Sequence, residues 1–117
     1  MSRSKGARGE REVSKILQDH FPDLEIRRGI QNRTGGDASD VEGSPLHVEV
    51  KYGKKVRLRA ALDQAVQDSQ RTQRPPVVIA KEDRKEHVVY MRLSDFLPMA
   101  QAWWKHKIAD FQAREKT

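Results

Sequence analysis

The chain has no cysteine, no long apolar run and no apolar segment near its first residue. Without cysteine, disulfide bonds and thiolate metal sites are excluded, and a reducing compartment suits such a chain. No stretch approaches the roughly 18 apolar residues of a membrane span, and the start, MSRSKGARGERE, lacks the apolar core of a secretion signal. The sequence therefore predicts a cytoplasmic protein, in the host cytoplasm if it is viral, that does not enter a membrane.

The length and the charge are the most informative features of the composition. A chain of 117 residues fits one domain of roughly 100–150 residues, and we expect 1–117 to form a single domain with 1–6 as a flexible basic start. Lysine and arginine total 23 against 17 acids, a net charge of +6. The positive charge gathers in 1–11, 27–33 and 51–59. Clustered positive charge suits a polyanion such as nucleic acid, and the alternative is a basic surface without a partner.

The pattern of apolar residues predicts three helices and five strands. Helices are expected over 6–20 and 57–70 and after Pro98, which should separate a short first turn from the final helix. Strands are expected over 24–28, 39–43, 46–52, 77–80 and 87–92, with a loop at 29–36. This order predicts an α/β fold with a central mixed sheet of about five strands flanked by helices.

The segment DASDVEGSPLHVEVK places two acids opposite each other in a predicted hairpin. A turn at Ser44-Pro45 pairs Asp40 with Glu49, and directly opposed residues have Cβ atoms about 4.5–5.5 Å apart. Opposed like charges destabilise a strand pair unless something neutralises them, and carboxylate oxygens suit Mg²⁺ or Mn²⁺. Lys51 shares the face of Glu49 and could stabilise charge on a phosphate. The alternative is a solvated hairpin face on which Lys51 pairs with Glu49; Asp37 is a rival ligand that alternation directs to the other face.

A third acid lies on the first predicted helix. Its apolar stripe centres on one direction, and Glu10 lies about 40° from that direction. An acid on the inward side of a helix rarely lacks a partner. Glu10 is therefore a further candidate for the site, although near a helix start a glutamate can also reach water and favour the helix dipole.

These motifs together resemble a known family. KGARGEREVSKIL, then Asp40-Val41, then VEVK closely resemble the archaeal-type Holliday junction resolvases of the PD-(D/E)XK nuclease superfamily. The resemblance implies a restriction-endonuclease-like fold, a homodimer, and catalytic roles for Glu10, Asp40, Glu49 and Lys51. It implies a metal held by Asp40, Glu49 and the Val50 carbonyl with Glu10 in support. Asp40 follows Ser39, where many superfamily members have proline.

Several further residues are candidates for DNA contact or for support of the site. Phosphate binding needs charge and no base readout, which fits Lys5, Arg8, Arg11, Arg27, Arg28, Arg33, Lys54, Lys55 and Arg57. Gln64 is a possible supporting residue, because many superfamily nucleases place a glutamine on the helix after the E-x-K strand. Trp103 and Trp104 are expected to pack in a core or a dimer, with base stacking as the alternative. His20 and His47 lack ligand spacing for zinc.

The sequence as a whole predicts a Mg²⁺-dependent endonuclease, with Mn²⁺ as a possible substitute, that resolves four-way DNA junctions as a homodimer. Two alternatives stay open. One is a nicking or flap endonuclease with the same site, and the other is a DNA-binding module without catalysis.

Overall fold

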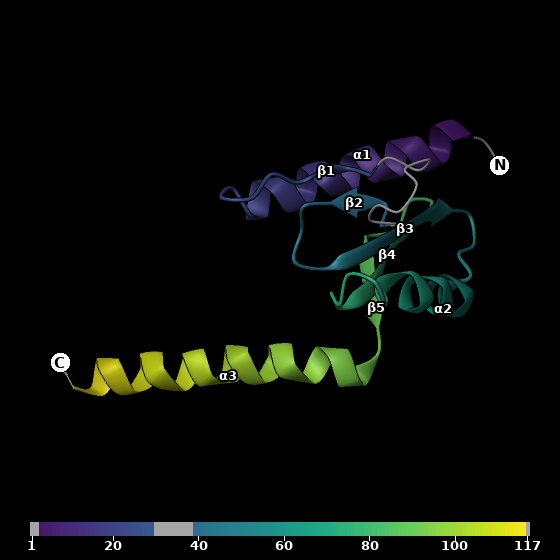
Figure 1. Ribbon diagram of the computed structural model, residues 1–117. Helices are drawn as coiled ribbons and strands as arrows, with labels where there is room; N and C mark the ends of the chain where they lie inside the picture. Colours follow the sequence, from purple (N-terminus) through teal and green to yellow (C-terminus); the bar gives the residue numbers. More distant parts are fainter. Residues whose placement is uncertain (1–2, 30–38, 117) are drawn as a thin grey trace.

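The computed structural model describes residues 3–29 and 39–116, and side chains from residue 6 onward within those ranges. Its helices and strands follow the predicted order (Figure 1), namely α1 (Arg3–His20), β1 (Arg27–Arg28), β2 (Val41–Glu42), β3 (His47–Gly53), α2 (Leu58–Ser69), β4 (Pro76–Glu82), β5 (Val88–Met91) and α3 (Leu93–Glu115). The strands form one 5-stranded sheet in the order β1-β2-β3-β4-β5. Only β3 and β4 run parallel within this sheet, so the predicted α/β fold with a mixed sheet is confirmed.

The first strand is shorter than the predicted 24–28, because α1 binds the backbone that precedes it. The Gln18 side-chain amide donates to the Leu24 carbonyl at 2.6 Å, and its oxygen accepts from the Ile26 N–H at 2.8 Å. These bonds occupy backbone groups that a longer strand would use in the sheet. At the start of α1, the helix begins at Arg3 and so precedes the predicted Gly6.

The hairpin between β2 and β3 has the predicted register. Val41 pairs with Val48, and the Asp40 N–H donates to the Val48 carbonyl at 2.8 Å. Gly43 lies in the turn with φ of +88°, and a Cβ there would lie 2.0 Å from the Glu25 carbonyl oxygen. Only glycine fits both requirements, so this one residue allows the chain to turn back beside β1.

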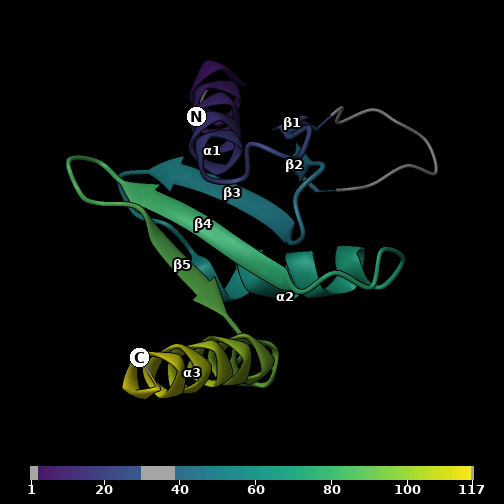
Figure 2. The same ribbon diagram turned by 90° about the vertical axis from the view of Figure 1, so that its left-hand side faces the viewer.

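The two faces of the sheet are covered by different helices (Figure 2). On the α1 face, Val13 packs in a core cluster with Val41, Val48, Val50 and others. On the α2 face, Ala61 and Leu62 pack against Val78 and Ala80 of β4. A parallel pair needs a crossover connection, and α2 supplies it between β3 and β4. The central strand β3 is therefore enclosed on both sides.

The last helix leaves this two-sided body. None of the α3 side chains from Leu93 to Glu115 is buried, and Figures 1 and 2 show the helix extending away from the sheet. The predicted interruption at Pro98 is wrong, since α3 runs through it. Pro98 cannot donate to the carbonyl of Ser94, but Ser94 is exposed and lies in the first turn, where water can serve that carbonyl. Trp103 and Trp104 are exposed, which excludes the predicted core role within one chain.

Within the described part of the chain, no helix has the length and apolar character needed to cross a membrane.

The Gly43 turn generates a test of stability. Gly43→Ala should lower the free energy of unfolding by on the order of 2 kcal/mol or more, because alanine is strained at positive φ and meets a backbone oxygen. Urea denaturation measures the change. Gly53→Ala is the matched control, since its Cβ would meet nothing nearer than 4.0 Å, and it should change stability by less than about 0.5 kcal/mol. Equal stability of the two variants would show that the turn does not require glycine at position 43.

Candidate active site

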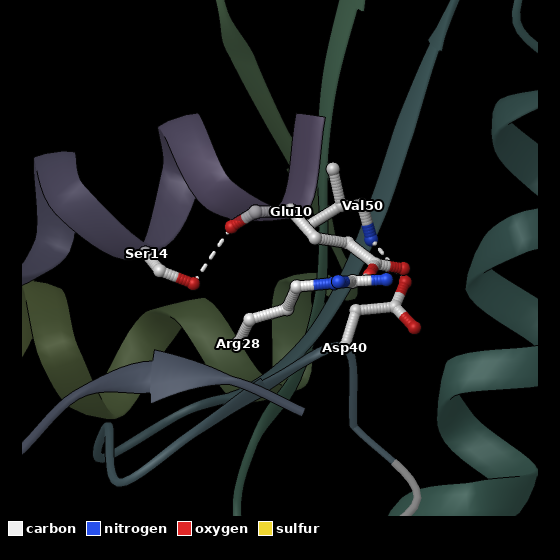
Figure 3. Close-up of polar contacts among 5 residues, drawn as sticks. All are labelled: Glu10, Ser14, Arg28, Asp40 and Val50. Carbon is white, nitrogen blue, oxygen red and sulfur yellow. Dashed lines mark hydrogen bonds and ion pairs between the residues drawn. The ribbon is translucent and has the colours of Figure 1, made fainter. Parts of the chain in front are cut away.

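Asp40 is buried immediately before β2 and is held there by the backbone on both sides. Its side chain is directed at β3, where Oδ2 accepts a hydrogen bond from the Val50 N–H at 2.8 Å (Figure 3). Its own carbonyl accepts from the Gly29 N–H at 2.8 Å. Only 8% of Asp40 is exposed. The carboxylate therefore has a position that the sheet determines.

Glu49 and Lys51 extend from the face of β3 that α2 covers. Glu49 pairs in register with Val78, which belongs to the α2 cluster. It is 9% exposed, and its Oε2 lies 3.5 Å from Nζ of Lys51, whose side chain is half exposed. The ion pair of the alternative prediction thus exists, but the acids are buried and the face is not solvated.

The electrostatics show that the two acids lie close to each other. The pKa of Glu49 is raised from 4.5 to about 7, chiefly by burial and next by the charge of Asp40, while Lys51 acts in the opposite direction. The nearby lysine therefore does not offset the cost of placing two carboxylates in this interior. A group of this kind favours a bound cation or a proton.

Glu10 points inward from α1, as the helical arithmetic predicted, and 12% of its side chain is exposed. Arg28 Nε donates to Glu10 Oε1 at 2.8 Å. Figure 3 shows the Glu10 carboxylate and the Arg28 guanidinium directed toward Asp40 and Val50. Arg28 was predicted only as a contact to DNA. Its hydrogen bond to Glu10 forms because β1 lies against α1, and the sequence did not predict that packing.

Gly9 explains how α1 comes so close to β3. A Cβ at Gly9 would lie 2.8 Å from a carbon of the Tyr52 ring. The Tyr52 hydroxyl donates to Glu12 Oε1 at 2.9 Å and lies 2.5 Å from Nε2 of His87. Burial and the Glu12 carboxylate raise the pKa of Tyr52. Sequence reasoning missed Tyr52 and His87, because they lie far apart in the chain, in β3 and directly before β5.

The donor set suits a hard cation, although the carboxylates are not gathered as a triad. Among residues 3–29 and 39–116, no three His, Cys, Asp or Glu side chains lie close enough to hold one ion. The Glu10, Asp40 and Glu49 carboxylates are therefore too far apart for all three to bind the same ion. Glu10 instead accepts a hydrogen bond from Arg28. Asp40, Glu49 and the Val50 carbonyl remain the oxygen donors that Mg²⁺ or Mn²⁺ would prefer here.

A cavity of about 940 Å³ opens beside Lys51, between the end of β3 and the start of α2. It is lined by the predicted DNA-contact residues Lys54, Lys55 and Arg57. Gln64 also lines it, and its Nε2 donates to both carboxylate oxygens of Asp68, at 3.1 and 3.0 Å. The structure thus gathers these basic residues beside Lys51.

The other predicted contacts that the structure describes do not line this cavity. Arg8 lies over the Tyr52 ring at 6.0 Å and Arg27 pairs with Glu42 at 3.5 Å. Arg11 is exposed on α1. The side chain of Lys5, and the residues Arg33 and Asp37, lie outside the described part of the chain. His47 is wholly buried in β3, and His20 at the end of α1 bonds the Ile16 carbonyl at 2.9 Å.

The five-stranded mixed sheet, a buried aspartate before one strand and an E-x-K motif on the next are together typical of a PD-(D/E)XK nuclease. The family model described as "Phage putative PDDEXK endonuclease" matches residues 1–116, and the chain belongs to this family. The fold is thus restriction-endonuclease-like and the protein is a nuclease, of a class that generally uses divalent metal ions. Comparison with curated proteins finds no match to this chain.

The raised pKa of Glu49 generates a test in metal-free buffer. Because the pKa is higher in the folded protein than its ordinary 4.5, folding favours the protonated carboxyl. That stabilisation is complete below pH 4.5 and is lost as the pH rises through about 7. Glu49→Gln is neutral at every pH, so above pH 7 this variant should be the more stable, by up to about 3 kcal/mol.

Urea unfolding in EDTA between pH 4 and 8.5 measures the effect. Glu25→Gln, which changes the same charge at an exposed position, is the control and should retain the wild-type pH profile. An unchanged profile in Glu49→Gln would show that Glu49 is not the buried titrating group.

Proposed function

We propose that this nuclease is a metal-dependent, structure-selective DNA endonuclease that resolves four-way junctions as a homodimer. The observation that carries the proposal is the buried pair Asp40 and Glu49, with Lys51 at the mouth of a basic cavity. Two acids in one interior, with a lysine at their exposed side, suit hydrolysis of a phosphodiester better than they suit a passive DNA-binding surface.

The residues have distinct roles in the proposed reaction. Asp40, Glu49 and the Val50 carbonyl would hold Mg²⁺, and Mn²⁺ could replace it; when bound, such an ion supplies Lewis-acid chemistry to phosphate and water. Lys51 can extend to the phosphate because its side chain is half exposed, and there it stabilises the charge that develops on the oxygens. Glu10 supports the site through Arg28, which lies between α1 and Asp40.

The surface around the site supports backbone recognition of DNA. Lys54, Lys55 and Arg57 line the cavity that begins at Lys51, so a strand bound along them would present its phosphate to the acids. Such contacts carry no base information, and this agrees with selection of DNA by shape. Two copies related by a two-fold axis would match the symmetry of a four-way junction.

Removal of either acid should abolish cleavage while the protein still binds DNA. Asp40→Asn and Glu49→Gln each remove a metal-binding charge, and Lys51→Met should lower the cleavage rate by roughly 100–1000-fold. Cleavage of a labelled four-way junction with Mg²⁺ or Mn²⁺ measures activity, and anisotropy measures binding. Because Glu49→Gln is expected to be stable at neutral pH, its loss of cleavage cannot result from unfolding. Glu25→Gln is the control and should cleave normally.

The choice of DNA decides between the proposed function and its alternatives. Four-way junctions, flaps, nicked duplex and linear duplex should be compared at equal concentration, with junctions cut fastest and at paired positions on opposite strands. Preference for flaps or nicked duplex would replace the resolvase by a nicking or flap endonuclease. If none of these substrates is cut with either metal ion, the chain is a DNA-binding module and the proposal fails.

The basic cavity generates a separate prediction on binding. Lys54→Ala and Lys55→Ala should each reduce the slope of log affinity against log salt by about 1, because each removes one phosphate contact. Junction and duplex affinities should fall by similar factors. Anisotropy titrations over a series of salt concentrations measure this. Lys15→Ala, whose charge pairs with Asp19 on α1, should leave the slope unchanged, and an unchanged slope in the cavity variants would remove the cavity from the DNA path.

A further inference from the structure

The helix α3 carries an apolar stripe that no part of the described chain covers. The α3 stripe consists of Leu93, Leu97, Trp103, Trp104, Ile108 and Phe111, which are between 38% and 68% exposed. At 100° per residue they lie within an arc of about 140° on the helix. Lys105 and Gln112 lie outside this arc, whereas Lys107 lies within it, with its Nζ 5.8 Å from the centroid of the Trp103 ring. The arc is therefore predominantly apolar and faces water.

A helix in this situation needs a partner in order to be stable. Most helix stability in proteins comes from packing of an apolar face, and no α3 side chain from Leu93 to Glu115 is buried. Pro98 lies inside the helix, where a proline costs about 3 kcal/mol or more. Something outside the single chain must offset these losses.

The exposed apolar side chains of α3 have about the surface area that each partner buries in a stable dimer. The four aromatic residues, which are Phe96, Trp103, Trp104 and Phe111, are about half exposed or more, and each could bury on the order of 100 Å² further. The aliphatic residues add a comparable area. Together these contributions approach the roughly 800 Å² that each partner buries in a standard interface.

We propose that the α3 stripe is the interface between two copies of this chain, with α3 packed against α3 across a two-fold axis. The stripe runs for about 27 Å along the helix, so two antiparallel copies cover each other over its whole length. Because the same surface is used twice, the contact closes at two chains and leaves no apolar surface for further growth. This inference rests on the homodimer of the proposed function and assigns it a surface.

The position of α3 in the fold agrees with this assignment. The helix follows β5, which is one edge of the sheet, whereas Asp40 precedes β2 near the opposite edge. Three strand spacings of about 4.8 Å separate β2 from β5. Glu49 and Lys51 lie on β3, two strands from β5, and no α3 residue lines the basic cavity. A contact through α3 therefore leaves the acids and the cavity of each copy open to DNA.

The mass of the protein in solution tests the inference with one matched pair of variants. Phe111→Glu places a charge in the stripe, and Gln112→Glu places the same charge on the adjacent position outside it. By sedimentation velocity, the wild type and Gln112→Glu should have twice the 13.5 kDa of one chain. Phe111→Glu should have the mass of one chain, with a dissociation constant raised roughly 30-fold or more.

Tryptophan fluorescence provides a second measurement of the same contact. The chain has 2 tryptophans, and both lie on α3, so the emission reports on this helix alone. Dilution of the wild type should shift the emission to longer wavelength as Trp103 and Trp104 become exposed. Phe111→Glu should show the shifted emission at every concentration. Leu93→Lys, at the other end of the stripe, repeats the test, and circular dichroism verifies that the variants fold.

Each contrary outcome has a separate meaning. If Phe111→Glu and Leu93→Lys remain dimers, the interface lies elsewhere and the inference is wrong, while the homodimer stands. A monomeric wild type overturns both the inference and the homodimer, and assigns the stripe to a different protein. In either case cleavage of nicked or linear DNA by Phe111→Glu tests the nuclease separately, since Phe111 belongs to α3, which extends away from the sheet (Figure 1).

Discussion

The hydrogen bond from the Val50 N–H to the Asp40 carboxylate joins the fold to the candidate chemistry. It exists because β2 begins only after Asp40, which leaves the Val50 N–H facing a side chain where a longer strand would offer a carbonyl. The turn at Gly43 and the pairing of Val41 with Val48 determine which residue takes that place. A slip of one residue in this register would direct the acids to opposite faces of the sheet.

The burial of β3 under α2 determines the electrostatics of Glu49, which lies opposite Asp40. Without α2, Glu49 would lie on a solvated face, and Lys51 would neutralise it at little cost. With α2 in place the carboxylate is buried beside Asp40, and its pKa rises to about 7 despite the lysine. The site therefore holds more negative charge than its own residues compensate, which is the condition that favours a divalent cation over an inert ion pair.

The described molecule combines a packed body with one unpacked helix. The sheet, α1 and α2 bury the apolar clusters and position the acids, and this part has what a small nuclease needs for chemistry. The helix α3 contributes nothing to either cluster, yet it carries the two tryptophans. The candidate catalytic residues lie before β2 and on β3, whereas the proposed contact between two copies follows β5 at one edge of the sheet.

The sequence by itself determined the elements and the local geometry, because these depend on spacing along the chain. The predicted turn at Ser44-Pro45 placed Asp40 opposite Glu49, and alternation placed Lys51 on the same face as Glu49. Helical periodicity turned Glu10 inward. Only the tertiary structure decided which contacts between distant segments form. Arg28 bonds Glu10, Tyr52 meets His87, α2 buries Glu49, and α3 continues through Pro98 without reaching the core. Such contacts depend on how helices pack on the sheet, and no pattern within one element specifies that packing.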